Sequence, residues 1–179
     1  MMRSNDAICW SPDYCLKWSD FQAESNPAIY EDSHSFLKYG FTWIVGSTTL
    51  NNDIVFSIDQ IQLFTEFHPL LSWVRKFELN DSLLKHEQGH FDLCEIIKTN
   101  YYHILKNEFY GKVFPTRGQN DAQRKQFAKE DSGKLISTEI NKLNNILKEK
   151  REEYDNETEY GKNILNQTKY NDIFQKFKL

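Results

Sequence analysis

Aromatic and β-branched residues dominate the first third of the chain, and such residues are typical of strands. Three segments carry this pattern: CLKWSDF at 15–21, FLKYGFTWIVGSTTL at 36–50 and IVFSIDQIQLFTEF at 54–67. Polar residues separate the last two segments, and LSWVRKF at 71–77 predicts one further short strand. Residues 1–78 are therefore expected to form an antiparallel sheet.

The pattern of hydrophobic positions becomes helical after this region. Asn80, Asp81 and Ser82 have side chains that can accept hydrogen bonds from the free backbone N–H groups of a first helical turn. Apolar residues then recur at helical spacing as far as Phe109. The sequence therefore predicts one long central helix within residues 79–110.

The last third of the chain predicts two more helices. Glycine and proline interrupt the pattern after the central helix, and the polar stretch 117–131 is expected to be a loop. From Ser132 a long helix carries one apolar stripe, made of Ile136, Ile140, Leu143 and Leu147. A shorter helix follows from Asn163 to Phe177, so that residues 132–179 are helical. The pattern predicts a single α+β domain over residues 1–179.

Composition and charge narrow the class of protein. Apolar residues make up 39% of the chain and aromatic residues 15%, which favours a folded core. The net charge of -4 comes from interspersed acidic and basic residues, so nucleic acid is not an expected partner. No apolar run approaches the about 20 residues that span a bilayer, and the opening MMRSNDAICW lacks the apolar centre of a signal peptide.

The three cysteines do not build a disulfide framework. Their number is odd, so at least one thiol lacks a partner within the chain. Turn-forming residues between Cys9 and Cys15 allow a bridge between these two, or both remain reduced.

The central helix contains the motif H-E-x-x-H, formed by His86, Glu87 and His90 within LLKHEQGHFDLCEIIK. A spacing of four residues turns both imidazoles to one side of a helix, where they can bind the same zinc ion. Glu87 lies one position further round, where its carboxylate can take a proton from a water molecule that zinc activates. The motif predicts a zinc-dependent hydrolase with Glu87 as general base.

Both histidines are expected to face the protein interior. They share one stripe of the helix with Leu83, Cys94, Ile97, Tyr101 and Ile104. The opposite face carries Lys85, Gln88, Asp92 and Glu95 and is expected at the surface. Inward-facing imidazoles need partners. The alternative to a metal is a pair of core histidines that bind tyrosine hydroxyls or backbone carbonyls.

Four segments together resemble a known bacterial family. They are LLKHEQGHFDLCE, the pair Ser72-Trp73, the early LKWSDFQ and the late YDNETEYG. In this order they resemble the family named domain of unknown function nine hundred and twenty-two, which is described as secreted zinc-dependent proteases. The resemblance covers most of the chain and implies a zincin-like fold with an antiparallel sheet, the metal helix and a long C-terminal helix.

The same resemblance bears on the third zinc ligand. The late signature of the family reads Y-D-x-x-T-x-H, and its histidine looks like that ligand, but Tyr160 stands at this position here. Three arrangements are open: Tyr160 ligates zinc, Glu157 one turn earlier supplies a carboxylate, or two histidines and solvent hold zinc weakly. Tyr154, Asp155 and Thr158 match the signature, and we expect them to orient the ligands or to cap the helix.

Three hypotheses about function follow. The first is a zinc metallopeptidase that hydrolyses peptide or protein substrates. The second is a pseudoenzyme that keeps the fold and acts as a binding module because the third histidine is replaced by Tyr160. The third is a metal-free interaction domain. The family resemblance implies an extracytoplasmic location for a chain trimmed at its N-terminus, and the chain as it stands implies a cytoplasmic one.

Overall fold

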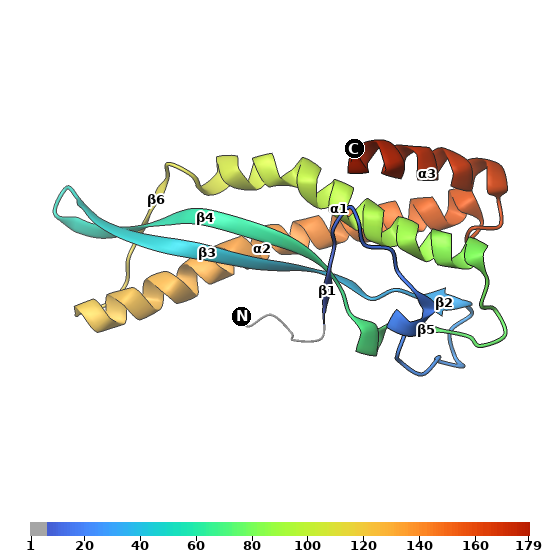
Figure 1. Ribbon diagram of the computed structural model, residues 1–179. Helices are drawn as coiled ribbons and strands as arrows, with labels where there is room; N and C mark the ends of the chain where they lie inside the picture. Colours follow the sequence, from blue (N-terminus) through green and yellow to red (C-terminus); the bar gives the residue numbers. More distant parts are fainter. Residues whose placement is uncertain (1–6) are drawn as a thin grey trace.

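A long β-hairpin forms the spine of the molecule. The computed structural model describes residues 7–179, so most of the opening segment considered for a signal peptide lies outside the described residues. Strands β3 (Leu37–Leu50) and β4 (Asp53–Phe67) pair in antiparallel fashion along nearly their whole length (Figure 1). Asn51 and Asn52 make the turn in the left-handed region, with φ of 49° and 68°, as asparagine tolerates. The two long predicted strands are confirmed.

Short strands complete two sheets. β1 (Ile8–Cys9) and β6 (Val113–Pro115) both pair with β4 in antiparallel fashion. β2 (Ser33–His34) pairs with β5 (Trp73–Val74) in a separate two-stranded sheet, and β5 confirms part of the strand expected at 71–77.

The strand predicted for CLKWSDF is wrong. The segment contains a single 3-10 turn, η1 (Trp18–Asp20), with no strand on either side of it. The Asp20 carboxylate accepts a hydrogen bond from the Lys17 backbone N–H at 2.8 Å and from the Tyr14 hydroxyl at 3.0 Å. This local side-chain bonding favours a turn over a strand. A second 3-10 turn, η2 (Pro69–Leu71), follows β4.

The central helix forms where the sequence predicts it. Helix α1 (Asp81–Phe109) begins at its N-cap Asn80, whose side chain accepts a hydrogen bond from the Leu83 backbone N–H at 2.9 Å. Helix α3 (Ile164–Lys178) confirms the helix predicted from Asn163 to Phe177, and the Asn163 side chain caps its first turn. The two helices therefore confirm the value of asparagine as a start signal.

The loop predicted over 117–131 is wrong for most of its length. Helix α2 (Asp121–Thr158) begins eleven residues before Ser132, since the Asn120 side chain accepts a hydrogen bond from the Gln123 backbone N–H at 3.0 Å. A bidentate ion pair between Arg117 and Asp131, at 2.7 and 2.8 Å, joins the preceding segment to this first part of the helix. The polar composition reflects an exposed helix rather than a loop.

One hydrophobic core joins the hairpin to α1 and α2. The apolar stripe predicted on α2 is buried, and it packs with Tyr39, Phe56, Ile58, Cys94, Ile97 and Leu105 among others. A smaller cluster of Leu16, Phe21, Phe67 and Phe91 lies under the N-terminal segment. The α+β class is therefore confirmed. Among residues 7–179, no helix combines the length and the apolarity that crossing a bilayer requires.

The face of α1 that was expected at the surface is covered in part: Lys85 is exposed as predicted, whereas Asp92 and Glu95 are buried. Asp92 is 2% exposed and forms an ion pair with Lys178 of α3 at 2.7 Å, while the Trp10 indole N–H donates to it at 2.9 Å. Glu95 is also buried and pairs with Lys98. The surface prediction for both acids is wrong because α3 and the N-terminal segment pack on this face. Cys9, Cys15 and Cys94 are unpaired thiols, so the Cys9–Cys15 bridge is not formed.

Candidate metal centre

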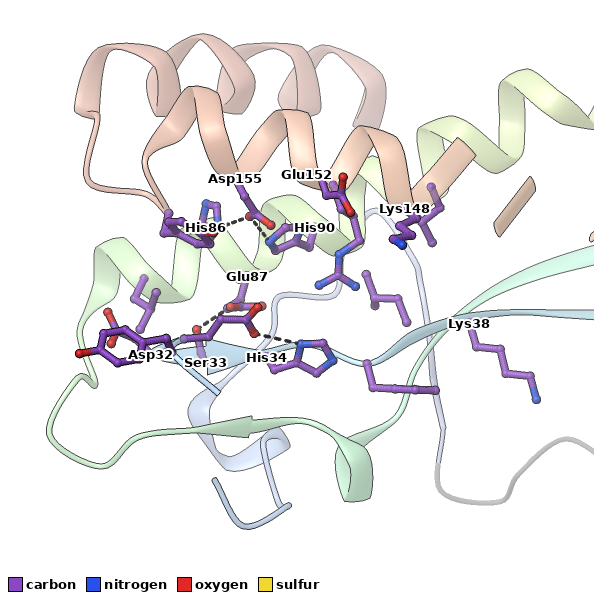
Figure 2. A pocket seen from close by; sticks show the side chains of 18 of the residues that line it. Asp32, Ser33, His34, Lys38, His86, Glu87, His90, Lys148, Glu152 and Asp155 are labelled. Atoms are coloured by element: carbon purple, nitrogen blue, oxygen red, sulfur yellow. Dashed lines mark hydrogen bonds and ion pairs between the residues drawn. The ribbon is translucent and has the colours of Figure 1, made fainter. Parts of the chain in front are cut away.

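The N-terminal half of α1 and the C-terminal half of α2 come together at one point. The α1 side chains of His86 and His90 are 2% and 3% exposed, so the inward orientation predicted for them is confirmed. Asp155 reaches the same point from α2 (Figure 2). One donor atom from each of these three residues lies within 4.8 Å of the other two. This is the only such group of three or more His, Cys, Asp or Glu residues in the described chain.

Both imidazoles converge on one carboxylate oxygen. Nε2 of His86 lies 3.0 Å from Oδ1 of Asp155, and Nε2 of His90 lies 2.9 Å from the same oxygen. Figure 2 shows Asp155 placed between the two rings. Two nitrogens and one oxygen therefore meet around a common point, which is the donor set of many zinc sites.

The hydrogen bonds of His86 fix which of its nitrogens carries hydrogen. Nδ1 lies 3.2 Å from Oε1 of Gln167 and 3.3 Å from Oγ1 of Thr158. The Thr158 hydroxyl donates to the Tyr154 backbone carbonyl at 2.6 Å, so both of these oxygens accept from Nδ1–H. In the neutral ring Nε2 then carries a lone pair that faces the Asp155 carboxylate. A proton or a metal cation between the two atoms removes their repulsion.

His90 is held less completely. Its Nδ1 is buried and has no hydrogen-bond partner among the described residues, so Nε2 can carry either a hydrogen or a lone pair. Burial and the positive charge of Arg151 lower the pKa of His90 to about 4, although Asp155 acts in the opposite direction. The ring is therefore neutral near pH 7, as a metal ligand must be.

Asp155 is ionised at the same pH. Partial burial raises the pKa of its carboxyl group, but the contacts with the His86 and His90 imidazoles outweigh this and hold the pKa well below its usual range. One carboxylate and two imidazole donors thus meet in a buried cluster. The donor types, their spacing and the lone pair of His86 all fit a divalent cation.

Aromatic packing orients the first histidine. The Tyr154 ring stacks on His86 with 4.7 Å between ring centroids and 9° between planes, and it lies edge-on to His90 at 5.0 Å. A Cβ atom at Gly89 would overlap with the Tyr154 hydroxyl. Glycine at this position of α1 therefore allows the close approach of α2, and Tyr154 and Thr158 contact the site as the signature implied.

A tight turn at the end of α2 closes the site from one side. Glu159, Tyr160 and Gly161 are all left-handed, with φ of 50°, 55° and 82°. A Cβ atom at Gly161 would lie 2.9 Å from Cβ of His86, so glycine lets the turn pack directly on the ring. The turn ends the helix and reverses the chain toward α3.

The two ligands considered from the family signature lie around this turn. Tyr160 is half exposed, its ring centroid is 6.5 Å from that of His86, and it lines the cavity described below. Glu157 accepts a hydrogen bond from the Tyr170 hydroxyl at 2.7 Å and is not part of the three-residue cluster. Ligation by Tyr160 stays a prediction, while Asp155 supplies the carboxylate that contacts both histidines.

Glu87 points from α1 toward β2 rather than toward α2 (Figure 2). It is 3% exposed, and it accepts hydrogen bonds from the Ser33 hydroxyl at 2.5 Å and from the Ser35 hydroxyl. Burial raises the pKa of its carboxyl group, but the electrostatic interaction with the adjacent His90 ring and the two serine hydrogen bonds outweigh burial, so the net pKa is lowered. Glu87 is therefore an ionised, fixed carboxylate beside the histidines.

A cavity of about 780 Å³ opens on this cluster. His86, Glu87, His90 and Asp155 line it, together with side chains from β2, β3 and α2. The volume lies in the range of small-molecule sites and accommodates several residues of an extended peptide.

Sequence reasoning found the α1 residues and missed several of their partners. Ser33, Ser35 and Gln167 gave no signal, because isolated serine and glutamine residues belong to no motif. Asp155 was expected only to orient ligands or cap the helix, although a carboxylate one turn before Thr158 could have been weighed as a donor. Compared with protein-family models, with curated proteins and with solved structures, the chain matches none.

Proposed function

We propose that the chain is a zinc-dependent peptidase of zincin-like fold, as its resemblance to the secreted protease family implies. The observation that carries the proposal is the convergence of His86, His90 and Asp155 below a cavity that also contains Glu87. A buried carboxylate between two imidazoles, one of which directs a lone pair at it, is a stable arrangement when a cation occupies the centre.

His86, His90 and Asp155 would hold the metal, and Tyr160 is the alternative third ligand at the rim of the cavity. A bound zinc ion would supply a Lewis acid that activates a water molecule and polarises a peptide carbonyl. Gln167 and Thr158 keep hydrogen on Nδ1 of His86, so that its Nε2 lone pair remains directed into the site.

Glu87 is the general base in this proposal. Its carboxylate is ionised, lies beside the histidines and lines the cavity, so it can take the proton of the attacking water and pass it to the leaving amide nitrogen. Ser33 and Ser35 fix the direction of the carboxylate through two hydrogen bonds. Positioning of this kind favours proton transfer along one path.

The substitution Glu87→Gln tests the proposal. Zinc content, measured by elemental analysis of the purified protein, should stay near one ion per chain, while hydrolysis of a mixed peptide library falls by about 100-fold or more. Glu108→Gln, at an exposed position of the same helix, is the matched control and should leave hydrolysis unchanged. Equal hydrolysis by the wild type and the Glu87→Gln variant would refute Glu87 as the base.

A second candidate is a metal-binding module without hydrolytic activity. It is favoured by the hydrogen bonds that Ser33 and Ser35 donate to Glu87, because they lower the pKa of the carboxyl group and so weaken it as a base. In that case the wild-type protein binds zinc and no peptide of the library is cleaved at any pH between 5 and 9.

A further inference from the structure

The cavity above the metal centre carries an unusual set of charges. Its acidic residues are Glu31, Asp32, Glu87, Glu152 and Asp155, and its basic residues are Lys38, Lys148, Arg151 and Lys162. The acids do not neutralise these cations, because most of the acids are already bound to other groups of the protein.

Four of the five acids have partners within the protein. Glu87 is bound by two serines and Asp155 by two histidines. Asp32 forms an ion pair with Lys162 at 3.7 Å, and Glu31 lies 3.4 Å from His34. Among the lining acids only the exposed Glu152 remains to balance the other cations.

Three cations are left without a carboxylate partner. Within residues 7–179, no acidic side chain lies at ion-pair distance from Lys38, Lys148 or Arg151. Lys148 and Arg151 are one turn apart on α2, whereas the Lys38 side chain, which also lines the cavity, runs from β3 away from them (Figure 2). Figure 2 shows Lys38 and Lys148 on the side of His90 that is away from His86. Positive charge therefore collects at this end of the cavity.

Arg151 is fixed next to the catalytic groups. Its Nη1 donates a hydrogen bond to the backbone carbonyl of Ser35 at 2.9 Å, and the Ser35 hydroxyl in turn donates to Glu87. A guanidinium has five N–H donors in a planar fork, so one bond to the backbone holds Arg151 in place and leaves the others for a ligand. A fork of this kind matches the two oxygens of a carboxylate.

We propose that Arg151 and Lys148 form a subsite for a carboxylate group of the substrate, and this inference rests on the proposed peptidase function. The carboxylate belongs either to an acidic side chain close to the cleaved bond or to the free C-terminus of the peptide. The subsite lies beyond His90, so it orients the substrate along the cavity from β2 toward β3. A substrate without a carboxylate at this distance binds more weakly.

Binding to the zinc-loaded Glu87→Gln variant tests this inference without any need for turnover. The probes are hexapeptides of neutral sequence in which a single glutamate or glutamine is moved through all positions, each with a free or an amidated C-terminus. Calorimetric titration should give at least one glutamate or free-acid peptide that binds about tenfold more tightly than its neutral counterpart. Preference for glutamate identifies a side-chain carboxylate, and preference for the free acid identifies the C-terminus.

Variants of the two cations on α2 must remove the preference. Arg151→Gln and Lys148→Gln, each placed in the Glu87→Gln background, should bring the charged and neutral peptides within about twofold of each other. Lys150→Gln is the matched control, since Lys150 is exposed on the same helix and does not line the cavity. If Arg151→Gln does not fold, as judged by circular dichroism, the exposed Lys148→Gln carries the test.

The outcomes separate this inference from the proposed function. Equal binding of charged and neutral peptides, or no binding of any peptide, overturns the carboxylate subsite even if the wild-type protein cleaves peptides. A preference that disappears in Lys148→Gln and not in Lys150→Gln supports the subsite even if no peptide is cleaved, in which case the peptidase proposal alone fails.

Discussion

The Asp155 carboxylate of α2 contacts both histidines of α1 at the candidate metal centre. Its Oδ1 atom contacts the Nε2 atoms of two histidines that lie 65 and 69 residues away in sequence. Its negative charge also compensates the charge that a divalent ion brings into a buried position. Asp155 is for these reasons the donor whose removal should have the largest effect after the histidines.

Asp155→Asn is therefore expected to weaken zinc binding by about 10-fold to 100-fold, because a neutral amide replaces an anionic donor. Tyr160→Phe and Glu157→Gln are the matched comparisons, since they remove the two donors considered from the family signature. Both should change the zinc dissociation constant by less than about threefold. Competition with a chromogenic chelator measures all three constants. A larger loss in Tyr160→Phe than in Asp155→Asn would make Tyr160 the third ligand.

Local spacing explains which site residues could be predicted. His86, Glu87 and His90 lie within one and a half turns of one helix, so their common location follows from the sequence alone. The contact of Asp155 with them depends on the angle between α1 and α2 and on the left-handed turn after Thr158. Neither leaves a periodic signal, because both follow from packing of residues far apart in the chain.

At the scale of secondary-structure elements, Gly89 allows a close contact between α1 and α2. The Tyr154 side chain lies across this glycine, donates to the His86 backbone carbonyl at 3.2 Å and accepts from Gln167 at 2.8 Å. Burial raises the pKa of its hydroxyl well above the usual range, so the group stays protonated and keeps donating. This contact sets the distance between the donors on the two helices.

Gly89→Ala should therefore move α2 away from α1. The added methyl group overlaps with the Tyr154 hydroxyl, and such overpacking lowers the free energy of unfolding by about 1 to 3 kcal/mol. This loss exceeds the stabilisation that the higher helix propensity of alanine provides. Zinc affinity should fall as well. Urea unfolding and the chelator competition measure the two effects, with the exposed substitution Asn100→Ala on the same helix as control. Unchanged stability and affinity would show that the contact does not set the donor distance.

Elements with a strong apolar pattern could be predicted from the sequence. Segments whose structure depends on side-chain hydrogen bonds or on neighbouring elements could not. The hairpin strands carry long apolar patterns, and α1 carries an apolar stripe that follows an asparagine start signal. The first turns of α2 are almost wholly polar, and their helical state depends on the Asn120 cap and on the helix that follows. CLKWSDF is as apolar as a strand, but its side-chain hydrogen bonds bend it into a turn.

For the whole molecule, the buried His90 makes stability depend on pH. Its pKa is about 4 in the folded protein and about 6.5 in the unfolded chain, so between these values the unfolded state binds more protons. The free energy of unfolding of the metal-free protein should rise as the pH rises through this window. The contribution of His90 is on the order of 3 kcal/mol, and it is complete above about pH 6.5.

Urea unfolding in the presence of a chelator at several values between pH 4 and pH 7 measures this slope. His90→Gln should flatten it, while His103→Gln, an exposed substitution on the same helix, should leave it as in the wild type. Glu87 and Asp155, whose pKa values are lowered, lose their contributions only at more acidic pH. A slope that His90→Gln leaves unaltered would place the titrating group elsewhere.

The long separation between the donors has a consequence for biosynthesis. The ribosome completes His86 and His90 early but must add a further 65 residues before Asp155 exists. A growing chain therefore exposes two imidazoles without their anionic partner, and it gains the complete donor set only when α2 is nearly finished. Under the proposed peptidase function, the nascent chain therefore cannot hydrolyse neighbouring proteins before α2 is synthesised.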